Sequence, residues 1–182
     1  MKILTGIAEL KYPFRTMFIL FSGLIFMSSC TSICFENPQP VGQKNLAEFP
    51  KKLVGLYIDV ENGDTVVTIF HDGFTIHLND ENVKILLSEK SVLRKYKSYY
   101  FLNLRNDEDS LWTVYIADPG KKKTLVLYDI FTGEDQLEQL KAITEVKHKG
   151  DAEETFYINP TLEELNRIIK TGLLKPTQKL KK

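Results

Sequence analysis

The chain has 182 residues, of which 43% are hydrophobic, and its 24 basic and 24 acidic side chains leave no formal net charge. This composition is typical of a globular protein of one domain. Nucleic-acid-binding proteins usually carry a basic excess, so the balanced charge argues against a nucleic-acid partner. The two cysteines, Cys30 and Cys34, both precede the expected globular part. Their position predicts neither a disulfide framework nor a thiolate metal site in the core.

The first thirty residues have the order of charged and apolar side chains that is typical of a secretory leader. A basic stretch up to Arg15 precedes an apolar run over 17–27, and the small-residue segment Ser28-Ser29-Cys30 follows. The apolar run is much shorter than the ~20 residues of a membrane-spanning helix. It therefore predicts the central part of a cleaved signal peptide.

The segment Ser28-Ser29-Cys30 resembles the lipobox of bacterial lipoproteins, although Met27 stands where leucine is usual. The resemblance implies that residues 1–29 are removed as a signal peptide and that acyl chains such as palmitate on Cys30 hold the mature chain to a membrane. It places the protein in the cell envelope outside the cytoplasm, at the outer membrane if the cell is diderm. The alternative is an uncleaved N-terminal anchor that extends through residues 30–33, with the domain on the same side of the membrane.

Residues 30–52 are expected to form a lipidated tether between the anchor and the domain. Three prolines and a glycine interrupt this segment, and its apolar residues follow no period. Such a composition favours an extended spacer. Leu46 and Phe49, near its end, are candidates to pack onto the domain.

Residues 53–174 predict a mainly β (α+β) domain that begins with two hairpins. Asn62-Gly63 and Asp72-Gly73 are strong hairpin signals, because the turn they favour requires positive φ at both central residues. These turns pair Ile58 with Val67 and Ile69 with Ile76. One face then collects Leu56, Ile58, Val60, Val67, Ile69, Phe74, Ile76 and Leu78.

A second antiparallel meander is predicted after the hairpins. Its three strands are expected near 98–105, 111–117 and 123–130. Leu102 is expected opposite Val114, and the following turn places Leu125 and Leu127 on the same apolar face. Between the two meanders, residues 83–87 predict a short strand.

Two helices are predicted near the C-terminus. The first covers about 134–146 with Thr132 as its cap, and the second begins at Asn159 as N-cap with Pro160 at its first position. Their apolar stripes consist of Leu137, Leu140, Ile143 and Val146, and of Leu162, Leu165, Ile168, Ile169 and Leu173. A basic tail over 175–182 is expected to fray. The predicted fold is an antiparallel meander sheet of six or more strands, in a half-open barrel or a two-layer sandwich, with two C-terminal helices.

Motifs of reactive or metal sites do not stand out in this sequence. His71, His77 and His148 are separated by the predicted register and by the chain, and they lack the spacing of metal ligands. The acidic run 107–109 lacks the alternating layout of a calcium loop and predicts a solvated turn. Nucleophile, phosphate-binding and dinucleotide motifs are also missing. The sequence therefore predicts a protein without a cofactor that is not an enzyme.

Aromatic side chains on the strand faces opposite the predicted core are the most suggestive feature. They are Tyr57, Phe70, Tyr99, Phe101, Tyr115 and Tyr128. Three interpretations fit them: ordinary packing between strands or under the helices, an exposed surface that docks an envelope protein, or the lining of an apolar pocket.

The leading hypothesis is a lipid-anchored envelope protein without enzymatic activity, which binds another protein or has a structural role. The alternative is a lipocalin-like binder of a small apolar ligand, and the oligomeric state is left open. An apolar cavity of roughly 300 Å³ or more would favour the ligand binder. A filled core with an aromatic patch outside would favour the leading hypothesis.

Overall fold

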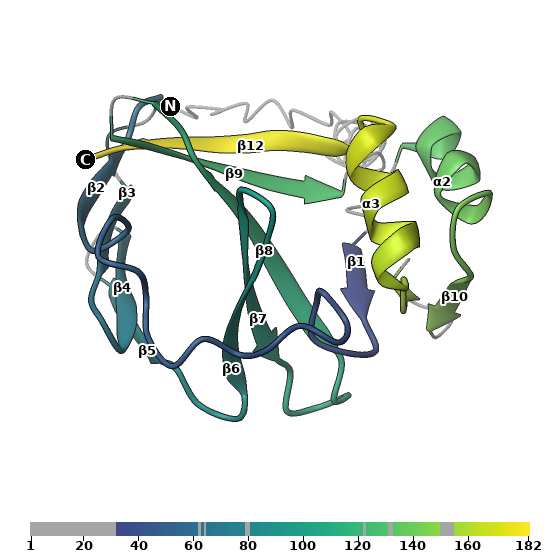
Figure 1. Ribbon diagram of the computed structural model, residues 1–182, viewed down its shortest axis with the longest axis horizontal. Helices are drawn as coiled ribbons and strands as arrows, with labels where there is room; N and C mark the ends of the chain where they lie inside the picture. Colours follow the sequence, from purple (N-terminus) through teal and green to yellow (C-terminus); the bar gives the residue numbers. More distant parts are fainter. Residues whose placement is uncertain are drawn as a thin grey trace, which may run out of the picture. The chain divides into compact units, whose positions relative to one another are not determined.

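The computed structural model describes residues 32–61, 63, 65–78, 81–121, 123–130, 133–149 and 155–182. Within them, twelve strands form one mixed, mostly antiparallel sheet, and two short helices lie near the C-terminus (Figure 1). This arrangement confirms the predicted mainly β fold with two helices after the meanders. Neither of these two helices is long and apolar enough to cross a bilayer.

Nine of the strands curl around one interior space (Figure 1). They are β2 (Gly55–Asp59), β3 (Thr65–Ile69), β4 (Gly73–Leu78), β5 (Glu81–Leu86), β6 (Ser91–Tyr96), β7 (Tyr99–Arg105), β8 (Trp112–Pro119), β9 (Thr124–Ile130) and β12 (Leu174–Lys181). Their order across the sheet is β5-β4-β3-β2-β12-β9-β8-β7-β6, and all neighbours are antiparallel. β5 and β6 end this order without pairing in the described part of the chain, so the curled sheet is open between them.

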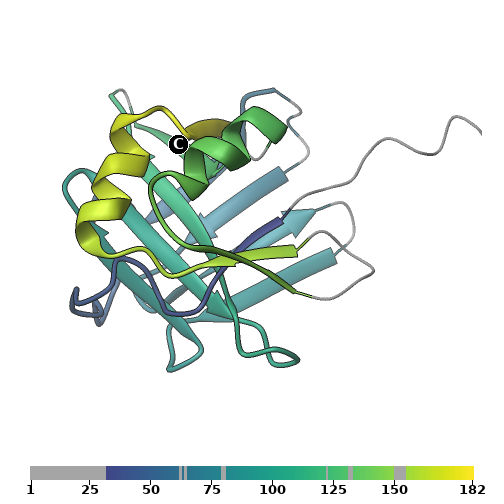
Figure 2. The ribbon, with the colours of Figure 1, turned by 90° about the vertical axis from the view of Figure 1, so that its right-hand side faces the viewer.

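The other three strands and both helices lie together on one side of the curled sheet (Figure 2). They are β1 (Ser32–Phe35), β10 (Val146–Lys149), β11 (Thr155–Ile158), α2 (Glu134–Lys141) and α3 (Leu162–Lys170). β1 runs parallel to β11 and joins the sheet where Phe35 pairs with Trp112 of β8. β10 pairs with β11 at the end of this extension.

Side chains of β7 alternate between two hydrophobic cores. Phe101 is fully buried in a core that also contains Ile116 of β8 and Leu165 of α3. The preceding residue, Tyr100, belongs to a second core inside the curled sheet, together with Leu93 of β6. Because successive side chains of a strand point to opposite faces, a strand between two cores must be apolar on both faces.

The predicted register of the first hairpin is wrong by one residue. Tyr57 pairs with Val67, and Ile58 pairs with Val66. Tyr57 therefore points inward, and the outward-facing Leu56, Ile58 and Val60 are between 44% and 52% exposed. A turn-initiating contact accounts for the shift, because Asp59 accepts a hydrogen bond from the backbone N–H of Glu61 before the Asn62-Gly63 pair is reached.

The second hairpin keeps the predicted faces but not the predicted pairs. Ile69 lies opposite Phe74 rather than Ile76, a shift of two residues that leaves the same side chains inside. His71 and Asp72 form the turn, because Phe70 donates its backbone N–H to the carbonyl oxygen of Gly73. Gly73 itself begins β4, where a Cβ would lie 2.3 Å from the carbonyl oxygen of Ile85.

The strands of the second meander lie close to their predicted bounds, but their register is also shifted. Leu102 pairs with Tyr115 rather than Val114. Leu125 and Leu127 share a face with Ala117 inside the curled sheet, opposite to the face of Val114. The predicted strand near 83–87 is β5, whereas β6 was not predicted.

The first helix ends earlier than predicted and the second begins later. α2 ends at Lys141, and Val146 already belongs to β10. Gly133 is its N-cap, and the predicted cap Thr132 lies outside the described residues. The N-cap of α3 is Thr161 rather than Asn159. Its hydroxyl accepts from the backbone N–H of Glu164, and the Glu164 carboxylate accepts from the backbone N–H of Thr161.

Residues 32–52 were expected to form a tether, and the structure instead places them in the folded domain. β1 belongs to the sheet, and Phe35 and Phe49 are buried. Between them, the backbone N–H of Gln39 donates to Asn103 Oδ1 over 2.6 Å, and Asn103 Nδ2 donates to the carbonyl oxygen of Gln39 over 2.9 Å. This pair of hydrogen bonds fixes the segment onto β7.

The C-terminal segment 175–182 is not frayed as expected. Leu174–Lys181 form β12, which pairs with β9 on one side and with β2 on the other. It is therefore an inner strand of the curled sheet. The predicted signal peptide 1–29 and the lipidation site Cys30 lie outside the described residues.

Candidate ligand-binding cavity

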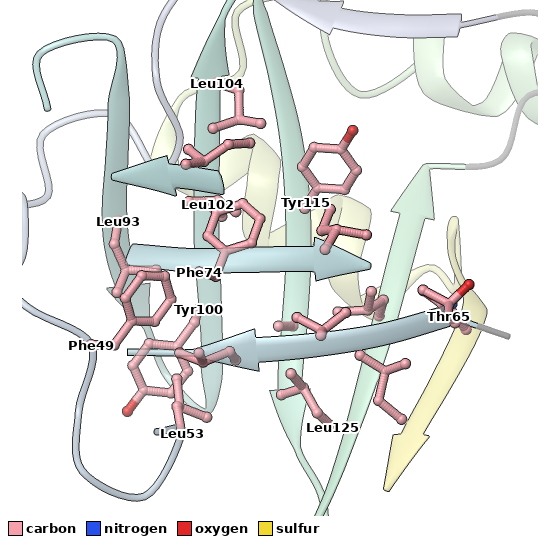
Figure 3. A pocket seen from close by; sticks show the side chains of 18 of the residues that line it. Phe49, Leu53, Thr65, Phe74, Leu93, Tyr100, Leu102, Leu104, Tyr115 and Leu125 are labelled. Carbon is pink, nitrogen blue, oxygen red and sulfur yellow. The ribbon is translucent and has the colours of Figure 1, made fainter. Parts of the chain in front are cut away.

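The curled sheet encloses a cavity of about 450 Å³ (Figure 3). Inward-facing side chains of eight strands line it, together with two residues that precede β2. The lining consists of Phe49, Leu53, Thr65, Val67, Ile69, Phe74, Ile76, Val83, Ile85, Leu93, Tyr100, Leu102, Leu104, Tyr115, Ala117, Leu125, Leu127, Gln178 and Leu180. No charged side chain is among them, so the cavity suits an apolar molecule.

One end of the cavity is closed by buried side chains. Phe49 and Leu53, which precede β2, pack there with Phe74, Leu93 and Tyr100, and each of the five is almost completely buried. The rings of Phe49 and Phe74 form an edge-to-face pair with centroids 6.3 Å apart. Such pairs add to the stabilisation that comes from burial alone, so this end is a packed part of the core.

The other end of the cavity is accessible. Val83 of β5 is 50% exposed and Tyr115 of β8 is 47% exposed, although both line the cavity. Thr65, Leu104 and Gln178 are half-buried and also belong to the lining. The side chains that line the cavity thus change from fully buried to half-exposed along its length, which defines a mouth and a closed end.

Polar groups in the lining are few, and the best-fixed one is the amide of Gln178. Its Nε2 donates to Oδ2 of Asp59 over 2.6 Å. Asp59 is only 6% exposed, and its Oδ1 accepts from the backbone N–H of Glu61 over 2.8 Å. The register of β12 against β9 shifts between Pro176 and Gln178, and this bulge turns the Gln178 side chain to the inner face.

Lysines surround the aromatic residues of the closed end. The ammonium groups of Lys52 and Lys95 lie 5.2 and 5.8 Å from the ring centroid of Tyr100, and that of Lys182 lies 5.8 Å from the ring of Tyr57. Burial raises the pKa of the Tyr57 phenol above its usual value. None of these lysines is among the residues that line the cavity, so they do not contribute charge to its lining.

The six aromatic residues singled out in the sequence do not form one exposed surface. Tyr57 is buried in the inner core and Phe101 in the core beneath the helices. Tyr99 and Tyr128 form a half-buried edge-to-face pair, 6.0 Å between centroids, against the core beneath the helices. Phe70 and Tyr115 are exposed, and of the six only Tyr115 lines the cavity.

The three histidines also lie apart, as their sequence positions indicated. His71 Nδ1 lies 3.8 Å from Glu48 Oε2, His77 hydrogen-bonds to Asn82, and His148 packs against Phe156. No three His, Cys, Asp or Glu side chains form a metal-binding group within the described residues. In the acidic run, Asp107 forms an exposed ion pair of 2.6 Å with Lys90.

Several lining residues were not identified from the sequence. Gln178 and Leu180 lie in the segment that was expected to fray, and Leu93 lies in the strand that was not predicted. Phe49 was identified only as a candidate to pack onto the domain. The one available signal was the alternation of β12, in which Gln178 and Leu180 are inward while the lysines between and beside them are outward.

No family model, curated protein sequence or solved structure matches the chain.

Proposed function

We propose that this protein is a lipid-anchored envelope protein whose β domain binds a small apolar molecule inside the curled sheet. The observation that carries the proposal is the cavity of about 450 Å³, with apolar side chains along its length and an accessible mouth. Pockets for small molecules commonly have volumes of ~300–1,000 Å³ and a mainly apolar lining with few polar groups. The sequence hypothesis of a lipocalin-like binder set the same criterion.

The hypothesis of a protein-docking aromatic surface has less support. It required several aromatic side chains to be exposed together, and Tyr57 and Phe101 are buried in different cores. The cavity, in contrast, is a space that the apolar side chains of the inner core surround without filling it. Interior side chains of proteins normally pack densely, so an unfilled apolar space of this size is better explained by a ligand.

The expected anchor fits the same function. Acyl chains on Cys30 would keep the domain close to a bilayer, which is a reservoir of apolar molecules. Since the described domain begins at residue 32, the anchor and the domain are neighbours in the chain. We therefore expect the ligand to be membrane-derived.

The test is binding of N-phenyl-1-naphthylamine, whose fluorescence rises in apolar surroundings, to the full chain held in amphipol. Ala117 lines the cavity on β8, so Ala117→Phe should fill part of it and weaken binding by about tenfold or more. Ile58→Phe places a ring on the outward face of β2 and serves as the matched control. Equal binding by the two variants, or no binding by the wild-type protein, would refute the proposal.

A further inference from the structure

The orientation of the Gln178 amide is determined by its neighbour. Asp59 receives N–H donors on both carboxylate oxygens, from Glu61 on Oδ1 and from Gln178 on Oδ2. A carboxylate can only accept hydrogen bonds, so the nitrogen of the Gln178 amide must face Asp59. The carbonyl oxygen of that amide, Oε1, is left for another partner.

This carbonyl oxygen belongs to a side chain that lines the cavity near its mouth. The structure records no hydrogen-bond donor to Gln178 Oε1 among the described residues. A carbonyl oxygen can accept but not donate. The amide therefore offers a fixed acceptor to whatever enters the cavity.

The remaining polar groups of the lining are not fixed as either hydrogen-bond donors or hydrogen-bond acceptors. Thr65, Tyr100 and Tyr115 carry hydroxyls, which can donate or accept by rotation. They can therefore pair with an acidic or a neutral head group equally well. Discrimination between head groups consequently depends on Gln178.

A carboxylate head would be poorly placed at this position. It would bring acceptor oxygens against the acceptor Oε1 of Gln178, and no lysine, arginine or histidine lines the cavity to pair with its charge. Leaving such polar atoms unpaired in a partly buried site is costly. A hydroxyl head would instead donate to Oε1.

The size and lining of the cavity define the rest of the ligand. Its volume of about 450 Å³ lies in the lower half of the range for small-molecule pockets. Apart from the Tyr100 hydroxyl, the lining is apolar from the closed end, at Phe49 and Phe74, to the Gln178 amide near the mouth. This order fits one aliphatic chain with a single polar head.

We propose that the cavity selects single-chain amphiphiles with a neutral, hydroxyl-bearing head and discriminates against fatty acids, with Gln178 as the residue that determines this specificity. The proposal rests on the proposed function of the cavity. Within it, Asp59 is a positioning residue, because it acts on the ligand only through the orientation of the Gln178 amide.

The test is displacement of N-phenyl-1-naphthylamine from the full chain in amphipol by monomyristoylglycerol and by myristate, which share one acyl chain. Measurements are made above neutral pH, where the fatty acid is ionised. The wild-type protein should bind the glyceride about tenfold more tightly than the fatty acid. Gln178→Met keeps an unbranched side chain without the carbonyl, and it should reduce the ratio to about one.

Ile58→Phe is the matched control, since it changes the outward face of β2 and keeps Gln178, and it should leave the preference unchanged. If Gln178→Met does not fold, Asp59→Asn replaces it, because an asparagine can donate to Gln178 and release the fixed orientation, which should lower the ratio.

Probe binding with equal displacement by both ligands, or with preference for myristate, would overturn the head-group proposal and leave the cavity function intact. Preserved discrimination in the Gln178 variant would overturn it as well. Failure of the wild-type protein to bind the probe would instead count against the proposed function.

Discussion

The backbone N–H of Leu46 donates to the carbonyl oxygen of Leu93 over 2.7 Å, which fixes the chain before β2 to the free edge of β6. Three residues later, the backbone N–H of Phe49 donates to the carbonyl oxygen of His71, also over 2.7 Å. His71 lies in the turn between β3 and β4, on the other side of the open sheet. In the described part of the chain, β5 and β6 do not pair with each other. The segment 46–49 therefore bridges the gap between them at the closed end of the cavity.

We expect Phe49→Ala to destabilise the domain and open the closed end of the cavity. Phe49 is buried against Phe74, and truncation of a buried phenylalanine commonly costs about 3–5 kcal/mol. Thermal denaturation of the full chain, followed by near-UV circular dichroism, should show Tm lowered by roughly 10 °C. Stopped-flow fluorescence should show faster entry of the apolar probe at temperatures where the variant is still folded.

Phe70→Ala is the control for that prediction, because Phe70 is exposed on the outer face. It should change Tm little and leave the rate of probe entry as in the wild-type protein. An equal effect of both substitutions would mean that Phe49 does not close the cavity.

Gly73→Ala should destabilise the protein, although Gly73 is not in the turn. An added Cβ would lie 2.3 Å from the carbonyl oxygen of Ile85 and 3.0 Å from Cα of Leu86, so β4 and β5 would have to separate. We expect a loss of about 1–3 kcal/mol in the free energy of unfolding, by analogy with overpacked sites. Urea denaturation measures it directly.

Gly172→Asn provides the contrast for Gly73. A Cβ at Gly172 meets nothing within 4 Å, and its φ of 76° is one that asparagine tolerates. The unfolding free energy of this variant should stay close to that of the wild-type protein. A loss for Gly172→Asn as large as for Gly73→Ala would contradict the steric explanation.

Cys30→Ala should yield a precursor that is neither lipidated nor cleaved. The lipobox resemblance implies that the Cys30 thiol takes the diacylglyceryl group and that cleavage after Ser29 requires this modification. Mass spectrometry of the membrane fraction should find acyl mass on an N-terminal Cys30 in the wild-type protein only. Cys34→Ala is the matched control, because Cys34 lies in β1 opposite Tyr157 and should not affect lipidation. A mature N-terminus elsewhere, without acyl mass, would refute the prediction.

Turn chemistry located the hairpins in the sequence but did not determine their register. A glycine after an aspartate is typical of a turn, yet Gly73 is required where β4 approaches β5. The backbone that Gly73 approaches belongs to Ile85 and Leu86 of β5, further along the chain, so the local sequence around Gly73 does not reveal this contact. Similarly, the Asp59 carboxylate that accepts from Glu61 at the shifted turn also accepts from Gln178, which is 119 residues away in the sequence.

The two-core arrangement explains the remaining errors of register. Hydrophobic alternation determines register only where one face of a strand is polar. In β7, Tyr100 and Phe101 are both buried, one in each core, so either face is a plausible inner face. β12 presents the opposite difficulty, because its lysines are typical of a frayed tail and only Leu174 and Leu180 are buried. Its place between β9 and β2 depends on pairing with distant strands.

Alkaline pH should destabilise the wild-type protein more than Tyr57→Phe. Burial raises the pKa of the Tyr57 phenol above its usual value near 10. The folded state therefore holds the phenolic proton more tightly than the unfolded state. The resulting stabilisation is complete below the unfolded pKa and is lost as pH rises from about 10 through the folded pKa. Phenylalanine at this position has no proton to lose, so the free energy of unfolding should fall less between pH ~8 and ~11. Urea denaturation at both pH values measures this fall in the free energy of unfolding. An equal fall for the wild-type protein and for Tyr57→Phe would contradict the burial of a protonated phenol.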